Sequence, residues 1–433
     1  MSDPEGTRAD PGGAARPAAT QNEPIVRGPR RTAERIGGIL PGRQGLNLHI
    51  YPSEMVLDSP LLRISATLQE TGYFSATHLV GIVGGQPPGE TALGEGRYIT
   101  RLGQAGVSGS GLKRAQARLT WFGHVYARYR RQPVEMVTAH SVWTFPVAWA
   151  LARRTGAALV YGTQELETET PTMTGVKQKV ARAIERLLIK SAALVTCVNS
   201  PIAAWYAQTY GIRMPVIIRN IPEAPVFDTV ELREVLGLSD SDRIFIHTGR
   251  MTDGRHIEQI LAAFGDAPAS NHVVFLGSGE LMPLVQSAAA ANDNIHLLPA
   301  VAPERVVPHV AGADVSLCLI EPKALSYRLA APNKLFEGLR AMRPVLCTDL
   351  PAAADLFGEL WPEWHITDVP RELPTFIAAL DDARLQRFAD RFPGLPSWEE
   401  EIAPFLAAVA AVLTDDPGCL LYTSPSPRDR TRS

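Results

Sequence analysis

The stretch Leu325–Cys347, LSYRLAAPNKLFEGLRAMRPVLC, decides how the fold of this chain is interpreted. It holds a loop with a serine and a tyrosine, a helix that begins at Pro332–Asn333, and an apolar strand at Val345–Cys347. Proline suits the first helical turn because its missing N–H would have no partner there. Lys334 and Glu337 fall near the start of this helix, where peptide N–H groups favour anions. The pair suits a phosphate and a sugar hydroxyl, although an ordinary helix with solvated charges is the alternative.

Length and composition describe a globular protein with room for two domains. The chain has 433 residues, of which 45% are hydrophobic and 20% are charged, and this is enough for two separate cores. A formal net charge of -3 argues against a dedicated nucleic-acid binder, which should be basic. No apolar run reaches the length of a bilayer-spanning helix, and the N-terminus lacks a signal-peptide pattern. Four cysteines without paired spacing favour a cytoplasmic protein without disulfides.

Both ends of the chain are expected to lie outside the fold. Residues 1–45 are rich in Pro, Ala, Gly and Arg and show no apolar periodicity, which predicts a disordered segment. Cys419–Asp429 reads CLLYTSPSPRD and resembles a translated sequencing adapter. We therefore interpret residues 419–433 as an artefactual tail, with a natural Ser/Pro/Arg tail as the alternative.

The first half, residues 46–222, has the alternation of a Rossmann-like domain. Strands are predicted at Leu46–Tyr51, Ala76–Ile82, Glu135–Ala139, Ala158–Tyr161, Leu194–Val198 and Val216–Ile218, with helices at Leu61–Thr71, Pro146–Arg154 and Ser200–Tyr210. Strand, helix and strand in this order form the unit of a parallel sheet. Ligands bind at the carboxyl ends of such strands, which is where His140, Gln164 and Glu165 fall. A structural hydrogen-bonding role is the alternative for His140.

Residues 223–396 are predicted to form a second Rossmann-like domain after a linker at Pro222–Val226, which contains two prolines. Its strands are expected at Arg243–His247, Val273–Leu276, Ile295–Leu298, Val315–Leu319 and Val345–Cys347. This second alternation of strands and helices again predicts a parallel sheet with its polar loops at one edge.

Two arginines flank the turn after the first strand of the second domain. Arg250 and Arg255 precede a helix at Ile257–Phe264, so both can converge on its N-terminus. The planar guanidinium fork suits a diphosphate, and Gly249 would let the backbone approach a ligand. Two solvated arginines are the alternative. The nearby Gly277–Gly279 is too short to indicate an NTPase or NAD site.

These pieces together resemble the GT-B glycosyltransferases, and the motifs of the second domain are similar to those of family 4. The segment Pro332–Glu337, followed by Arg343-Pro344-Val345, matches the acidic-helix motif of that family. The turn from Gly249 to Arg255 matches its Gly-Arg turn ending in Lys-Gly, with Arg255 for the lysine and His256 for the glycine. The resemblance spans about residues 46–413. It implies an α/β fold of two Rossmann-like domains facing across a cleft, with a C-terminal helix, 397–413, returning to the first domain.

The resemblance also implies a reaction and its residues. A bacterial enzyme of polysaccharide biosynthesis would move a sugar, with retention and without a metal, from a UDP- or GDP-sugar to a glycan, lipid-linked or small-molecule acceptor. Arg250 and Arg255 would bind the diphosphate and stabilise the leaving nucleotide, and His140 would lie near the transferred sugar. The donor-binding residues would be Gly249, Asn333, Lys334, Glu337 and Tyr327, with Glu337 on the ribose.

Some positions depart from the family pattern. The motif usually begins with a second glutamate eight positions before Glu337, and Leu329 stands there. A subgroup with Ser-Tyr-Arg shares this loss, so Tyr327 and Arg328 are expected to reshape the sugar pocket. Gln164 stands where related sequences often have histidine. Two alternatives stay open: a nucleotide-sugar epimerase, and a non-catalytic nucleotide-sugar-binding protein, which Leu329 favours.

Two predicted helices of the first domain are strongly basic. Residues 111–131 carry six Lys and Arg residues around Trp121 and Tyr126, and residues 176–190 carry five around an apolar set. A basic amphipathic helix can dock on an anionic membrane surface. We therefore hypothesise peripheral contact with the inner face of the plasma membrane, with a solvated helix face as the alternative.

Overall fold

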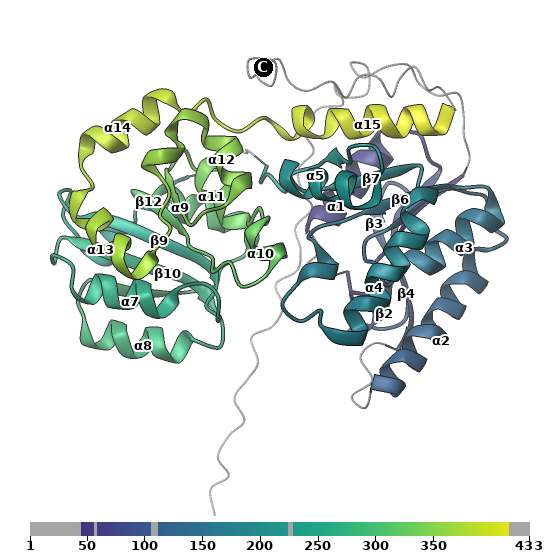
Figure 1. The fold of residues 1–433 in the computed structure, drawn as a ribbon, viewed down its shortest axis with the longest axis horizontal. Helices are drawn as coiled ribbons and strands as arrows, with labels where there is room; N and C mark the ends of the chain where they lie inside the picture. Colours follow the sequence, from purple (N-terminus) through teal and green to yellow (C-terminus); the bar gives the residue numbers. More distant parts are fainter. Residues whose placement is uncertain (1–44, 56–58, 105–110, 224–227, 415–433) are drawn as a thin grey trace, which may run out of the picture.

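The computed structural model describes residues 45–55, 59–104, 111–223 and 228–414, which form two lobes (Figure 1). The predicted disordered N-terminus, apart from Gly45, the adapter-like tail and most of the predicted linker lie outside the described residues. No helix among the described residues combines the length and apolar character that a membrane crossing needs.

The N-terminal lobe is built on an eight-stranded sheet in the order β3-β4-β2-β1-β5-β6-β7-β8. Its parallel strands are β1 (Leu46–Ile50), β2 (Ala76–Val83), β4 (Arg97–Gln104), β5 (Val134–Ala139), β6 (Ala158–Gly162), β7 (Leu194–Cys197) and β8 (Val216–Ile217). Strand β3 (Gly89–Gly94) pairs antiparallel with β4. This hairpin was not predicted, because β3 is almost wholly exposed and so lacks an apolar pattern.

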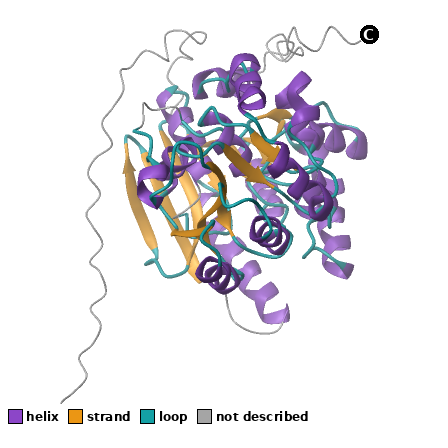
Figure 2. Ribbon diagram, turned by 90° about the vertical axis from the view of Figure 1, so that its left-hand side faces the viewer, coloured by secondary structure: helices purple, strands orange, loops and turns teal. Residues whose placement is uncertain are grey.

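Helices flank the strands (Figure 2). The N-terminal lobe contains α1 (Ser59–Glu70), α2 (Gly111–Tyr129), α3 (Phe145–Thr155), α4 (Gly175–Leu188), α5 (Ser200–Tyr210) and two short 3-10 turns, η1 (Glu167–Glu169) and η2 (Ile189–Ser191). Local signals set their ends. The side chain of Asn199 accepts a hydrogen bond from Ile202 N at the start of α5, and Gly211 ends this helix with φ 60.

The C-terminal lobe has a five-stranded, all-parallel sheet in the order β11-β10-β9-β12-β13. Its strands are β9 (Arg243–Arg250), β10 (Asn271–Ser278), β11 (Ile295–Pro299), β12 (Val315–Cys318) and β13 (Val345–Cys347). Its helices are α6 (Leu232–Leu236), α7 (Ile257–Gly265), α8 (Met282–Ala291), α9 (Val306–Ala311), α10 (Leu325–Arg328), α11 (Asn333–Arg340), α12 (Pro351–Phe357), α13 (Val369–Ala379) and α14 (Asp382–Arg391). The predicted class of fold, two Rossmann-like domains, is confirmed.

Two elements of this lobe differ from the prediction. Strand β9 continues through Thr248, Gly249 and Arg250, because these residues pair with Leu276, Gly277 and Ser278 of β10. The first two residues of the predicted turn from Gly249 to Arg255 therefore belong to the end of a strand. The segment that begins at Leu325 was predicted as a loop, but it forms the single-turn helix α10.

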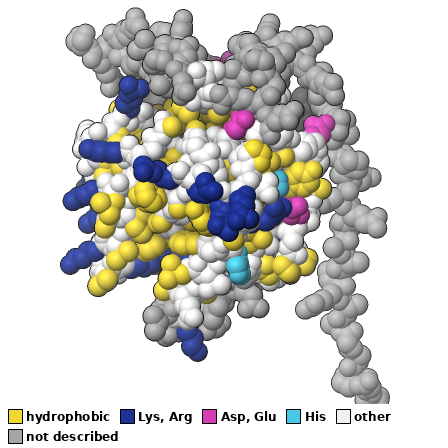
Figure 3. Space-filling view, turned by 90° about the vertical axis from the view of Figure 1, so that its right-hand side faces the viewer, with side chains coloured by type: hydrophobic (Ala, Val, Ile, Leu, Met, Phe, Trp, Pro, Cys, Tyr) yellow, Lys and Arg dark blue, Asp and Glu magenta, His cyan; other side chains and the backbone are white. Residues whose placement is uncertain are grey.

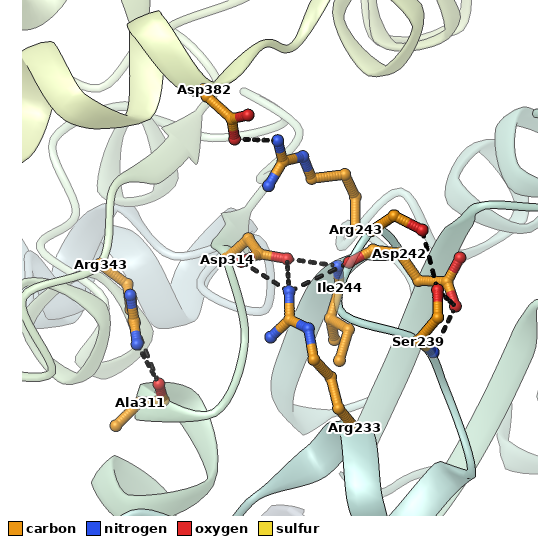
Figure 4. Close-up of polar contacts among 10 residues, drawn as sticks. Arg233, Ser239, Asp242, Arg243, Ile244, Ala311, Asp314, Arg343 and Asp382 are labelled. Carbon is orange, nitrogen blue, oxygen red and sulfur yellow. Dashed lines mark hydrogen bonds and ion pairs between the residues drawn. The ribbon is translucent and has the colours of Figure 1, made fainter.

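Charged side chains hold helices α6 and α9 in place in the C-terminal lobe (Figure 4). Asp314 accepts hydrogen bonds from Ile244 N and from the Arg233 guanidinium, both at 2.8 Å, which ties α6 to β9. Arg343 donates to the carbonyl oxygen of Ala311 at 2.6 Å. The arginine of the Arg-Pro motif therefore holds α9 in place.

The chain crosses between the lobes twice, and Arg340 of α11 holds both crossings. Its Nε donates to Pro222 O at 3.0 Å and its Nη2 donates to Pro396 O at 2.7 Å. After the second crossing, α15 (Trp398–Thr414) packs on the N-terminal lobe, as predicted, with Ile402 and Phe405 in one apolar cluster with strand residues. The same helix anchors through Glu401, whose carboxylate accepts from Arg219 Nη2 at 2.6 Å and from Arg219 N at 2.7 Å.

We predict that Glu401→Ala lowers the free energy of unfolding by about 2 kcal/mol, because a buried carboxylate loses hydrogen bonds to a charged group and to a backbone N–H. Urea unfolding followed by circular dichroism measures the change. The control is Glu399→Ala, an exposed residue of the same helical turn, which should change this free energy by less than about 0.5 kcal/mol. Equal effects of the two substitutions would show that the Arg219 contact does not anchor α15.

Candidate functional site

The carboxyl end of β9 and the start of α11 bring four polar side chains together. The Thr248 hydroxyl donates to Glu337 Oε2 at 2.9 Å. Lys334, one turn earlier in α11, is buried, and its Nζ lies 3.3 Å from His247 Nε2. Lys334 and Glu337 were predicted, whereas His247 and Thr248 were not. Their signal in the sequence is a polar pair that ends an otherwise apolar strand.

Burial controls the charge of this group. It lowers the pKa of Lys334 to about 8, with Arg255 acting in the same direction and Glu337 opposing it. It also raises the pKa of Glu337, which the hydrogen bond from Thr248 partly offsets. Lys334 gives one hydrogen bond among the described residues, so its ammonium has donors left for an anionic ligand.

Arg255 lies against an aromatic ring. Its guanidinium carbon is 5.0 Å from the ring centroid of Tyr327 on α10, within the range of a cation–π contact. His256, which follows it, has φ 53. This left-handed conformation explains why the family pattern has glycine there. The ring of Tyr327 thus positions Arg255. Through this contact the unpredicted helix α10 forms part of the candidate site.

Arg250 stands apart from this group. It lies at the exposed carboxyl end of β9, and its side chain makes no hydrogen bond or ion pair to another described residue. The expected convergence of Arg250 and Arg255 on one diphosphate stays a prediction.

The glycines beside Arg250 are required by backbone packing. A Cβ on Gly277 would lie 2.0 Å from Gly249 O, and one on Gly279 would lie 2.3 Å from Met251 O. Gly249 itself has φ 86, a conformation that favours glycine. The Gly277–Gly279 segment therefore lets two strand ends approach closely, which accounts for it without a phosphate.

The N-terminal lobe contributes a pocket of about 280 Å³ at the carboxyl ends of β5 and β6. It is lined by Tyr51, His140, Ser141, Tyr161, Gly162, Thr163, Gln164, Glu165 and Glu167. This set includes the predicted His140, Gln164 and Glu165. Glu167 holds the wall in place, because its carboxylate accepts from Ser141 Oγ at 2.8 Å and from Val142 N at 2.7 Å.

His140 is paired with a histidine that sequence reasoning missed. His140 Nε2 lies 2.8 Å from Nδ1 of His49 in the adjacent strand β1. Burial lowers the pKa of His49 to about 4, and burial together with His49 lowers the pKa of His140 well below its usual value. Both rings are therefore neutral near pH 7. The available signal was a histidine in an otherwise apolar strand that adjoins the site.

The segment from α10 to α11 also contacts the N-terminal lobe. Leu325 and Leu329 pack against that lobe's apolar core, and Leu329 O accepts from Asn199 Nδ2 at 2.8 Å. The amide of Asn220 donates to Asn333 Oδ1 at 2.8 Å. Leu329, where the family pattern has an acid, thus forms part of the contact between the lobes. The expected place of Asn333 near the sugar stays a prediction.

Comparisons with known proteins bear on the fold and on the first domain. Residues 61–220 match the family described as Glycosyl transferase 4-like domain. No match was found among curated proteins.

Solved structures match over both lobes. Sucrose-phosphate synthase from Thermosynechococcus elongatus has a TM-score of 0.63 at 15% identity, covering 86% of this chain and 100% of that one. Anabaena Alr3699/HepE in complex with UDP-glucose has 0.59 at 15%, covering 84% and 99%. WaaG, a glycosyltransferase involved in lipopolysaccharide biosynthesis, has 0.57 at 14%, covering 88% and 100%.

At these identities the solved structures establish the fold, and the match over residues 61–220 adds the family of the first domain. The chain therefore has the GT-B fold, and residues 61–220 of its first domain match a glycosyl transferase 4-like domain.

Proposed function

We propose that the protein transfers a sugar from a UDP- or GDP-sugar to a hydroxyl of a glycan, lipid-linked or small-molecule acceptor, with retention of anomeric configuration. The observation that carries the proposal is the buried Lys334 beside Glu337 at the start of α11, with Arg255 close enough to lower the pKa of the lysine. A buried cation and a carboxylate at a helix N-terminus suit a nucleoside diphosphate, which carries both phosphates and ribose hydroxyls. The similar HepE structure contains UDP-glucose, which supports this class of donor.

Each residue has a defined part in this proposal. Lys334, Arg250 and Arg255 neutralise the diphosphate, so that positive side chains take the place of a metal ion. Glu337 accepts hydrogen bonds from the ribose hydroxyls. Gly249, Asn333 and Tyr327 border the donor, and His140 faces the transferred sugar from the other lobe.

The proposed chemical step takes place on one face of the sugar. The bond from the anomeric carbon to the phosphate oxygen breaks, and a bond to the acceptor oxygen forms on the same face. The departing phosphate oxygen takes the proton of the acceptor hydroxyl. The guanidinium groups stabilise the charge that develops on this phosphate.

The position of Leu329 bears on the non-catalytic alternative. A leucine in place of an acid indicates loss of activity only if the leucine has no structural role of its own. Leu329 packs on the core of the opposite lobe, so its apolar character has a structural cause. This packing supports a catalytic protein over the non-catalytic alternative.

The proposal predicts that UDP or GDP is released only when an acceptor is present. It also predicts that Arg250→Ala weakens binding of the nucleoside diphosphate by roughly 10- to 100-fold. Titration calorimetry with UDP and GDP measures the affinity, and a coupled assay measures the release. Arg243→Ala is the matched control, because Arg243 lies at the opposite end of β9 and pairs with Asp382. Tight binding without turnover in any acceptor mixture would refute a transferase, and equal affinities of the two variants would refute the donor site.

We further predict that UDP affinity changes little between about pH 7 and pH 8 and falls above pH 8. The pKa of Lys334 is lowered to about 8 in the free protein, and a bound diphosphate favours the charged form. Affinity is therefore lost as the pH rises through that value, by up to about tenfold per pH unit. Calorimetry from pH 7 to 9 with the parent and Lys334→Met tests this. An identical pH dependence in both proteins would exclude Lys334 as the titrating group.

We also propose that the basic helices α2 and α4 bind an anionic membrane surface. Helix α4 exposes an apolar stripe, in which Val176 is 77%, Val180 45% and Leu187 79% exposed. Lys177, Lys179, Arg186 and Lys190 are exposed beside it. Lys and Arg side chains lie among apolar ones on the side of the lobe that carries α2 (Figure 3).

The inner face of α4 explains this arrangement. Glu185 is fully buried and accepts hydrogen bonds from the hydroxyls of Tyr161 at 2.6 Å, Tyr206 at 2.9 Å and Tyr210 at 2.7 Å. A carboxylate thus anchors the inner face while large apolar side chains point outward. Apolar residues beside lysines suit the boundary between lipid headgroups and acyl chains.

Flotation with liposomes tests the membrane surface. The parent protein should float with anionic vesicles and much less with neutral ones, and the double variant Val176→Ser/Leu187→Ser should bind roughly tenfold more weakly, because both side chains lose apolar burial. The control is Val235→Ser, since Val235 is 60% exposed on the other lobe. Equal recovery with both lipids, or an unchanged double variant, would contradict the proposal.

A further inference from the structure

A line of polar side chains leads from a backbone carbonyl group to the pocket at His140. Gln69 Nε2 donates to Phe74 O at 3.3 Å, and Gln69 Oε1 accepts from the Thr77 hydroxyl at 2.8 Å. Asn47 Nδ2 lies 3.4 Å from Thr77 Oγ1 and 3.0 Å from His49 Nε2. The line ends with the 2.8 Å contact between His49 Nδ1 and His140 Nε2.

The carbonyl oxygen of Phe74, at one end of the line, determines which atom donates in every hydrogen bond along it. A carbonyl oxygen can only accept, so the amide nitrogen of Gln69 must face Phe74, and its oxygen must face Thr77. Thr77 then donates its single hydroxyl proton to Gln69 and accepts from Asn47. The Asn47 amide nitrogen therefore also faces His49, whose Nε2 must be the acceptor.

The tautomers of the two histidines follow from this direction, since the partners of a ring decide which nitrogen carries its proton. His49 carries its proton on Nδ1 and donates it to His140 Nε2. His140, being neutral, then carries its own proton on Nδ1. That atom has no hydrogen-bond partner among the described residues, and His140 lines the pocket.

We propose that His49 is a positioning residue that fixes His140 as the Nδ1–H tautomer, so that His140 offers a hydrogen-bond donor to the ligand in the pocket. The ligand must then present an acceptor atom, such as the oxygen of a sugar hydroxyl. That it is the transferred sugar rests on the proposed function. In this tautomer His140 has no free lone pair and cannot act as a general base.

The opposite orientation of the Asn47 amide is less favourable. It would turn both amide protons away from Thr77 and His49 and would place the amide oxygen against the Thr77 hydroxyl oxygen, whose proton is already given to Gln69. In the orientation described, both protons are used and only Asn47 Oδ1 lacks a partner. Leaving one acceptor unpaired costs less than losing the hydrogen bond to Thr77 and facing two acceptor oxygens toward each other.

Gly162 keeps the space beside the proposed donor open. A Cβ at this position would lie 3.2 Å from His140 Nδ1 and 3.4 Å from His140 Cε1. Such a contact is tighter than normal packing, so a side chain there would press on the edge of the ring that carries the proton. Glycine at the end of β6 thus leaves that edge to the ligand.

Nitrogen NMR of the histidine rings tests the tautomer directly in the full chain. The protein has ten histidines, and His140→Gln identifies the signals of His140. We expect its Nδ1 to appear protonated and its Nε2 unprotonated throughout pH 6 to 8. Thr77→Val, which removes the hydroxyl that sets the direction but keeps the shape, should produce a mixture of the two tautomers. Finding His140 with its proton on Nε2 in the parent would overturn the proposal.

Variants of His49 connect the tautomer to function. His49→Leu should lower kcat/KM for the sugar donor by roughly 3- to 10-fold, the value of one hydrogen bond, while UDP affinity stays unchanged. His49→Asn should restore most of the loss, because its amide nitrogen can occupy the place of Nδ1. A loss that Asn does not restore, with the His140 signals unchanged in both variants, would overturn the proposal.

A matched control separates this effect from general destabilisation. His78 is a buried histidine of the neighbouring strand β2, and its Nδ1 contacts Thr100 and Tyr129 away from the pocket. His78→Asn should leave the His140 signals and kcat/KM unchanged even if it lowers stability. If no donor supports transfer in the parent, the proposed function fails, whereas the NMR signals still decide the tautomer.

Discussion

The structure depends on one segment, Leu325–Glu337, that is bound to both lobes at once. Leu325 and Leu329 pack against the apolar core of the first lobe. Lys334 and Glu337 contact His247 and Thr248 at the carboxyl end of β9 in the second lobe. The polar contacts from Asn199 and Asn220 occur at the same boundary. The residues proposed to bind the nucleotide therefore lie in the segment that joins the lobes, and the leucine in place of an acid adds an apolar contact there.

Much of this architecture could be predicted from the sequence, because parallel strands that are buried on both faces consist of short runs of apolar residues. Val345–Cys347 is such a run, and a proline before an apolar stripe predicts α11. The positions of Lys334 and Glu337 followed from the helix start. These features depend on neighbouring residues in the chain, which is why local patterns were sufficient.

Features that depend on distant partners could not be predicted in this way. The end of β9 at Arg250 is set by pairing with Ser278, and the exposed β3 has no apolar pattern to reveal it. His49 matters only because β1 lies beside β5, which brings His140 within 2.8 Å of it. The outward stripe of α4 likewise follows from Glu185 reaching three tyrosines of other elements.

Arg340 links the proposed nucleotide site to the two segments that connect the lobes. One guanidinium holds the two crossings of the chain at Pro222 and Pro396, and it is carried by the same short helix as Lys334 and Glu337. The start of α11, where the nucleotide is proposed to bind, and both crossings of the chain are therefore joined through the hydrogen bonds of a single side chain.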